Sequence, residues 1–263
     1  MNDMIFTILY WTYNISKVLS VLAVLVLGIL ITVGKVKSVK VLGISSIITA
    51  IQSGVSFAAT ISAHFCSDQM ISSLYTASSL IGSICSIGGF VCICLFLYRN
   101  YGARRVCIPI VIVTVLSNVL SFTALFILRS AGSGKTMPYI ISIVQSSIYF
   151  VAAAVVDIII IMVLYRNRQR EKVVPKFWVL RVIMLLWTVA TYAINTISYA
   201  VLISASDLRS TAELTGFAGA WNTNQDIIFT IFGILGAVLS VLVPAYVFAM
   251  VRENRSYLET NCN

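Results

Sequence analysis

The sequence predicts an all-helical polytopic membrane protein, a bundle of seven transmembrane helices with the amino terminus outside and the carboxyl terminus inside. Of its 263 residues, 59% are hydrophobic and 10% are charged, against about 45–50% and about 25% in ordinary globular domains. Seven apolar stretches are each long enough to cross a bilayer as a helix, which takes about 20 residues. The period-2 alternation of a membrane barrel is missing from them, so helices are expected.

The seven predicted spans fill the chain in order, with short connections between them. They lie at residues 10–33, 41–63, 71–98, 107–128, 139–164, 182–205 and 227–250. Basic residues mark most of the boundaries, in chain order Lys35, Lys40, Arg99, Arg105, Arg129, Lys135, Arg166, Arg181 and Arg252. Trp11 opens the first span and Trp178 precedes the sixth, as aromatic residues do at the headgroup level. We expect one domain over residues 1–263, and its last residues, 252–263, are expected to form a short cytoplasmic tail.

Lysine and arginine residues fall almost entirely on alternate connections. Connections 34–40, 99–105 and 165–181 and the tail from residue 252 hold fourteen of the eighteen. Because basic residues near helix ends resist translocation, these connections are predicted to face the cytoplasm. The net charge of +9 then faces anionic lipid headgroups, at about 1 kcal/mol per basic residue near the surface. Membrane lipid is therefore an expected partner, and nucleic acid is not.

The connection 165–181 is the most basic of these. Its basic side chains are Arg166, Arg168, Arg170, Lys172, Lys176 and Arg181. Pro175 separates a basic extension of the fifth span from the entry to the sixth. Two interpretations of this cytoplasmic basic loop stay open: a stop-transfer segment resting on anionic lipid, or a contact for a cytosolic signalling partner.

Asp157 is the one acidic residue inside a predicted span, at a cost of about 2.5–3.5 kcal/mol if it lies at the helix centre. Counting about 1.5 Å per residue places Asp157 roughly 12 Å above the inner boundary and Lys17 roughly 25 Å above it. We therefore expect no direct pair between them, and expect Lys17 to extend toward the outer headgroups. Asp157 is expected to be protonated or to have hydroxyl, amide or water partners. Its role is either structural or that of an ion, proton or switch site.

Polar residues on the other spans fall at one depth. The same counting places five of them roughly 16 to 20 Å above the inner boundary: Gln52, Ser86, Asn118, Asn195 and Ser240. Amides that face lipid are unfavourable, so these groups are predicted to point inward and to bond between helices. With Asp157 they form a predicted polar layer, which is either interhelical hydrogen bonding or the lining of a ligand site.

Signals of enzymatic chemistry are weak. The string GSGKT at residues 132–136 lacks the glycine that a phosphate-binding loop needs five positions before Gly134, where Arg129 stands. His64 is the only histidine, so a zinc site with a familiar ligand set is not expected. No nucleophile–base pair can be recognised. We therefore expect no enzymatic activity, no metal and no cofactor.

The seven-span plan resembles that of G-protein-coupled receptors, but the motifs of that family are missing. The acidic-Arg-Tyr triplet, which those receptors have at the inner end of the third span, would fall on residues 98–100, where only Arg99 is retained. Of their Asn-Pro-x-x-Tyr motif in the seventh span, only Pro244 is retained. The topology is therefore receptor-like without those motifs.

A second resemblance covers roughly residues 139–258. It lies in the segment VDII at 156–159, the basic run 166–176, the polar sixth span over 192–204 and the exit RENR at 252–255. These features are similar to those of a large group of fungal seven-helix membrane proteins that have no assigned biochemical function. The resemblance implies the fold and does not supply a ligand.

Together these features favour a receptor-like or sensory multi-pass protein of the plasma membrane or an endomembrane. In this hypothesis the polar layer takes a small-molecule ligand of unknown identity. The outer connection 206–226, which is longer than usual, covers it. The alternative is a small-solute or proton-coupled transporter that uses Asp157 as its proton or cation site. A structural or assembly role is the third hypothesis.

Overall fold

The computed structural model describes residues 2–63, 65, 68–131, 136–168, 174–205 and 216–253. These residues form seven long helices: α1 (Asn2–Val33), α2 (Lys40–Ala63), α3 (Asp68–Tyr101), α4 (Arg104–Ala131), α5 (Met137–Arg166), α6 (Phe177–Ala205) and α7 (Gly216–Glu253). One turn of 3₁₀ helix, η1 (Lys37–Val39), precedes α2. Each long helix contains one predicted span, and all seven are long and apolar enough to cross a membrane. The predicted fold class is confirmed.

The helices extend beyond the predicted spans. α7 begins at Gly216, whereas its span was predicted from residue 227. Apolar composition marks only the part of a helix that lies in hydrocarbon, and the helix itself continues into the interface. The predicted outer connection 206–226 is therefore wrong in its second half, because residues 216–226 belong to α7. Residues 206–215 lie outside the described residues.

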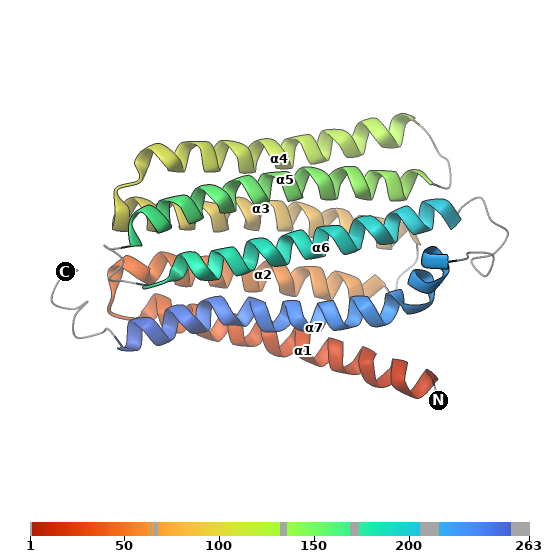
Figure 1. Ribbon diagram of the computed structural model, residues 1–263, viewed down its shortest axis with the longest axis horizontal. Coiled ribbons are helices and arrows are strands. Elements are labelled where there is room, and N and C mark those ends of the chain that lie inside the picture. Colours follow the sequence, from red (N-terminus) through yellow and green to blue (C-terminus); the bar gives the residue numbers. More distant parts are fainter. Residues whose placement is uncertain are drawn as a thin grey trace.

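The helices run side by side along the long axis of the molecule, and α1 begins at the end opposite to that where α7 ends (Figure 1). We call the end where α1 begins, and where α2, α4 and α6 end, the amino-terminal end. The opposite end carries residues 34–39, residues 102–103 and the connection after α5, and we call it the basic end. Which of the two faces the cytoplasm stays a prediction from the charge pattern.

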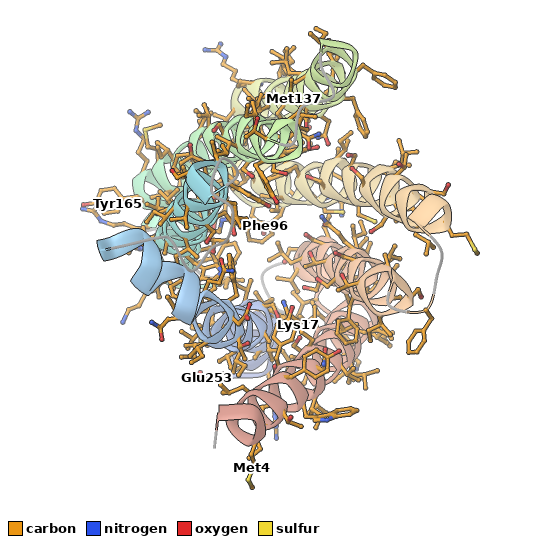
Figure 2. The ribbon with its side chains drawn as sticks, turned by 90° about the vertical axis from the view of Figure 1, so that its right-hand side faces the viewer. Met4, Lys17, Phe96, Met137, Tyr165 and Glu253 are labelled. Atoms are coloured by element: carbon orange, nitrogen blue, oxygen red, sulfur yellow. The ribbon has the colours of Figure 1, made fainter. Side chains whose placement is uncertain are left out.

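Viewed along its axis, the bundle is a ring of helices in chain order (Figure 2). Each helix packs on its neighbours in sequence, and α1 closes the ring on α7. Short connections produce this order because they make consecutive helices antiparallel neighbours. The contact between α6 and α7 is the least extensive in the ring. We call this contact the α6–α7 seam.

Large apolar side chains cover the outside of the ring. Ile84, Ile108 and Leu186 are 70%, 61% and 63% exposed, and many other aliphatic residues on all seven helices are exposed as well. An apolar surface of this extent is unfavourable in water, at about 25 cal/mol per Å². Lipid is the medium that suits it.

α1 and α2 approach each other closely at two glycines. A Cβ atom on Gly43 would come within 2.7 Å of the Gly28 carbonyl oxygen, and one on Gly28 within 3.0 Å of the Gly43 carbonyl oxygen. The Thr32 hydroxyl, one turn after Gly28, donates to the Gly28 carbonyl at 2.7 Å. Small residues at such a contact let two membrane helices pack backbone against backbone.

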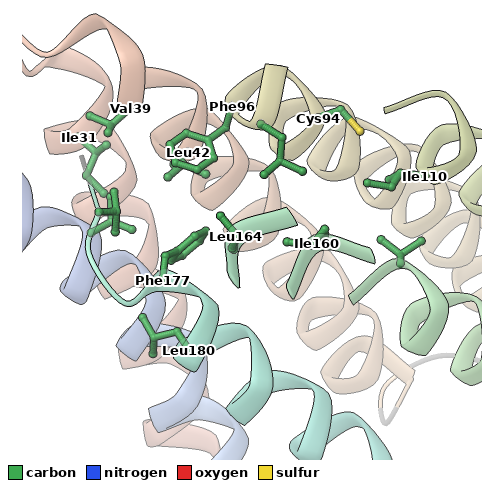
Figure 3. Packing of buried hydrophobic residues seen from close by; sticks show 14 of the residues in the cluster. Ile31, Val39, Leu42, Cys94, Phe96, Ile110, Ile160, Leu164, Phe177 and Leu180 are labelled. Carbon is green, nitrogen blue, oxygen red and sulfur yellow. The ribbon is translucent and has the colours of Figure 1, made fainter. Parts of the chain in front are cut away.

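The main apolar core of the bundle lies at the basic end. Its cluster of buried apolar side chains draws on all seven helices and on both flanking connections (Figure 3): Ile31, Val36, Val39, Leu42, Cys94, Phe96, Leu97, Ile110, Val156, Ile160, Leu164, Val174, Phe177, Leu180 and Val247. Phe96 packs edge-on against Phe177, with 5.9 Å between the ring centroids. The Tyr246 hydroxyl of α7 donates to the Pro175 carbonyl. Apolar packing thus joins all seven helices at the basic end.

Candidate functional site

A cavity of about 610 Å³ lies between α1, α6 and α7 in the amino-terminal half of the bundle. It borders the α6–α7 seam. Its lining combines five aromatic residues with two charged residues, two threonines and two glycines: Tyr10, Tyr13, Trp187, Phe229 and Phe232; Lys17 and Asp226; Thr191 and Thr230; Gly233 and Gly236. An apolar cavity of this volume with a few polar groups is typical of a small-molecule site.

Two glycines on α7 make room for the aromatic walls of this cavity. A Cβ atom on Gly233 would come within 2.6 Å of the Tyr13 ring, so the ring from α1 lies directly against the α7 backbone. One turn further on, a Cβ atom on Gly236 would lie 3.2 Å from the Trp187 ring of α6. Trp187 also stacks on Phe232, with 5.2 Å between the ring centroids and 18° between the planes. Rings from three helices therefore meet at one level of the bundle.

Lys17 lies inside the ring on its α1–α7 side (Figure 2) and lines this cavity. Its Nζ atom is 5.7 Å from the centroid of the Tyr13 ring, a cation–π contact. Among the residues that the structure describes, no carboxylate oxygen lies within 4.0 Å of that amine. The structure places Lys17 in the cavity wall, and its contact with the outer headgroups stays a prediction.

Asp157 forms an ion pair with Arg181. Both side chains are buried, with exposed fractions of 8% and 14%. The expectation of hydroxyl, amide or water partners, or of protonation, is wrong, because a guanidinium lies against the carboxylate. The assignment of Arg181 to the basic loop is also wrong. α6 begins at Phe177, so Arg181 lies in its second turn and faces α5.

A smaller cavity of about 180 Å³ lies beyond the ion pair, among α1, α2, α3, α6 and α7. Arg181, Met184 and Ser240 are part of its lining. The Arg181 Nε atom is buried and has no hydrogen-bond partner within the described part of the chain. Met184 and Ser240 lie about one helical turn from Trp187 and Gly236 of the large cavity. The two cavities therefore follow one another along the α6–α7 seam.

The six residues of the predicted polar layer are not joined to one another. All six are described, and no hydrogen bond connects any two of them. Ser240 donates to the Ala237 carbonyl of its own helix at 2.7 Å. Ser86 is half-buried on α3, and the Gln52 amide lies 3.8 Å from where a Cβ atom on Gly82 would be. The predicted hydrogen bonds between helices within this layer are therefore not present among these six residues, because depth alone does not fix the face of a helix on which a residue lies.

Asn118 belongs to a different polar feature. It lies on a buried stripe of α4 with Thr114, Ser117 and Ser121, and its amide donates to the Thr114 carbonyl at 2.8 Å. Gln145 of α5 donates across to the Ser121 carbonyl at 3.3 Å. Small polar side chains of this kind hold membrane helices together. Here Gln145 makes the bond between α4 and α5, whereas the Asn118 amide bonds within α4 and its side-chain oxygen has no partner among the described residues.

Asn195 lines a third cavity of about 390 Å³ beside α5 and α6. The Ser147 and Tyr192 hydroxyls are hydrogen-bonded at 3.0 Å, and the Tyr192 ring stacks on Phe150 with 4.2 Å between the ring centroids. Trp187 and Thr191 border both this cavity and the large one. α6 therefore presents one aromatic and polar stripe to two cavities.

The other predicted basic residues are partly described. Arg166 ends α5, the Arg168 guanidinium lies 4.1 Å from the centroid of the Tyr165 ring, and Lys176 has a φ of 59°. Arg170, Lys172, His64 and residues 132–135 of GSGKT lie outside the described residues. Within the described residues, no group of three or more His, Cys, Asp and Glu side chains could hold a metal ion.

Sequence reasoning missed most of the large cavity. Tyr10 and Tyr13 stand beside Trp11 at the entry of the first span, where aromatic residues indicate the membrane interface, and Trp187, Thr191 and Phe232 carry no motif. The available signal was the pair of glycines in the seventh span, at positions where rings of neighbouring helices could approach. Which rings approach could not be known without the packing.

Fold and cavity together define an integral membrane protein of seven transmembrane helices with an internal aromatic cavity. A comparison of the chain with protein-family models, curated proteins and solved structures finds no significant match. The comparisons thus support neither the resemblance to the fungal group nor a receptor family, and the function has to be argued from the site.

Proposed function

We propose that this chain is a receptor-like membrane protein that binds a small molecule in the cavity between α1, α6 and α7. The observation that carries the proposal is the difference between the two halves of the bundle. The amino-terminal half contains the aromatic cavity of about 610 Å³, whereas at the basic end apolar side chains from every helix pack together and leave only smaller cavities. A large cavity in one half above an apolar core in the other suits recognition of a ligand.

α6 connects the cavity with the basic end. It carries Trp187, a wall of the cavity, and Arg181, the partner of Asp157 on α5. It also begins next to Pro175, whose carbonyl accepts the hydrogen bond from Tyr246 of α7. A ligand that displaces Trp187 would move α6 against α7 at the weakest contact in the ring. Such a shift would change the surface that the basic end offers to a cytosolic partner.

The test is a distance measurement in nanodiscs. Spin labels are placed at Arg166 and Arg252, the exposed ends of α5 and α7, and a panel of small organic acids, amines and neutral amphiphiles is added. We expect at least one compound to change the distance between these labels. A pair at Lys35 and Arg104, remote from the α6–α7 seam, should change less.

Two results would contradict the receptor hypothesis. One is an unchanged Arg166–Arg252 distance with every compound that binds. The other is an equal response after Gly236→Val, because the added side chain would push the Trp187 ring and occupy the cavity.

A transporter is the second candidate, and the smaller cavity favours it. That cavity continues the large one along the α6–α7 seam, as the two halves of a solute path would in a transporter closed at one end. Uptake of a radiolabelled solute into proteoliposomes, abolished by Asp157→Asn in a variant that still folds, would favour transport. Distance changes at the basic end without any uptake would favour the receptor.

A further inference from the structure

We infer that the large cavity binds an amphipathic carboxylate, a single anionic group on an apolar body, with the carboxylate between Lys17 and Thr191. The inference deepens the proposed function, because it concerns the same cavity. It depends on the charge, the unpaired polar groups and the shape of the lining.

Lys17 has no neutralising partner among the residues that the structure describes. No carboxylate of the described residues is within 4.0 Å of its amine. Asp226, the other charged residue of the lining, lies closer to the amino-terminal end of α7. Tyr13 packs on Gly233, and Asp226 lies seven residues before Gly233, which corresponds to about 10 Å along the helix. A half-buried ammonium group in a membrane interior is costly unless an anion pairs with it.

A second polar group at the same level has no hydrogen-bond partner in the described part of the chain. The Thr191 hydroxyl lines the cavity and is buried without a hydrogen-bond partner among the described residues. Trp187 lies against Gly236, and α6 runs antiparallel to α7, so Thr191, one turn away, is at the level of Phe232 and Gly233. Tyr13 and the Lys17 amine above its ring are at that level too. A carboxylate has two oxygens and could accept from both donors at once.

The rest of the lining fits an apolar body. Phe229, Phe232 and Trp187 offer flat apolar faces. At the level of Thr191, with Asp226 about two helical turns away, the one cation of the lining matches one negative charge. A polyanion such as a nucleoside triphosphate would leave most of its charge unpaired in this cavity, at a large desolvation cost. An organic cation would be repelled by Lys17. Two sources supply the required chemistry: a fatty acid that enters from the bilayer, and an aryl or alkyl carboxylate that enters from water.

The experiment compares each acid with its own methyl ester on the wild-type protein in nanodiscs. Oleate and methyl oleate represent a ligand that enters from the bilayer. 4-Phenylbutyrate and its methyl ester represent a ligand that enters from water. Binding is read from the rise in unfolding temperature with concentration. We expect at least one acid to bind about 10- to 100-fold more tightly than its ester, as a charge-assisted hydrogen bond would give. The pair that shows this preference identifies the source.

Three variants assign the preference to Lys17. Lys17→Met removes the charge at similar length and should lower the affinity for the acid to that for the ester. Lys17→Arg should retain most of the preference. Lys35→Met, on the connection at the basic end, is the matched control and should change neither affinity. If Lys17→Met does not fold, the comparison of acid and ester on the wild-type protein still tests whether the cavity prefers a carboxylate.

Equal affinities for an acid and its ester in both pairs would overturn the inference. If those compounds still changed the Arg166–Arg252 distance, the receptor proposal would stand with another ligand class. Absence of binding by either acid, while other members of the panel move the labels, would overturn the inference in the same way. Binding of an acid with the expected preference but without movement of the labels would support the inference and contradict the receptor proposal.

Discussion

Individual polar residues inside this bundle have different roles that the sequence alone does not separate. Asp157 is paired with Arg181, Lys17 faces the large cavity, and Asn118 bonds within α4. Composition could single out each of these residues, because a charged or amide group inside an apolar span is costly. Their partners could not be predicted, since a partner depends on the rotation of two helices about their axes. Arg181 was missed because its charge placed it outside the apolar window.

The ion pair at the basic end predicts a strong dependence on both partners. Asp157→Asn or Arg181→Gln should each lower the free energy of unfolding by about 3 kcal/mol, because each leaves the other charge buried and unpaired. The double variant should lose less than the sum of the two. Thermal unfolding in nanodiscs measures this difference. Additive losses would mean that the two side chains act independently.

Gly233 predicts a steric effect on the contact between α1 and α7. Gly233→Ala places a methyl group against the Tyr13 ring, and we expect the free energy of unfolding to fall by about 1 to 3 kcal/mol from overpacking. Gly82→Ala is the matched control, because its Cβ atom would meet only the Gln52 amide at 3.8 Å. It should be neutral or slightly stabilising. A comparison of their unfolding temperatures checks the prediction, and equal effects would be inconsistent with the packing of Tyr13.

At the scale of elements, the seven helices were predictable and their mutual faces were not. The length and hydrophobicity of a span can be read along the chain, because the bilayer requires about 20 apolar residues. The start of α7 at Gly216 was missed, since Gly216, Ala218 and Asn222 extend the helix without making it more apolar. Which face of a helix meets protein leaves little trace in hydropathy, because lipid and protein surroundings are both apolar.

α7 and the connection before α6 predict a second measurable effect. Tyr246→Phe removes the hydrogen bond to the Pro175 carbonyl, and the loss should be about 1 kcal/mol. Amide hydrogen exchange of residues 174–180 should become faster, because this segment loses its attachment to α7. Tyr98→Phe, at an exposed position on α3, should leave exchange unchanged. Unchanged exchange in Tyr246→Phe would show that apolar packing alone holds the segment.

For the whole molecule, the central feature is the contrast between the two ends. Alternation of lysine and arginine predicted two chemically different ends, and the structure separates a basic end with an apolar core from a half that contains the larger cavity. The charge pattern could not predict which end holds the core. The core is built from large apolar residues such as Phe96 and Phe177, and they meet only because helices distant in sequence converge there.

Access of a thiol reagent to the two cavities tests this contrast most directly. Thr230→Cys in the large cavity and Ser240→Cys in the small one are made with the native cysteines replaced by alanine. A membrane-impermeant maleimide is then applied to sealed vesicles of each orientation, with an amino-terminal tag to report the side. We predict that the cysteine at 230 is labelled only from the amino-terminal side and that the cysteine at 240 is labelled from neither side. Labelling at position 240 from the basic side, or at position 230 from both sides, would contradict a site that is closed at its basic end.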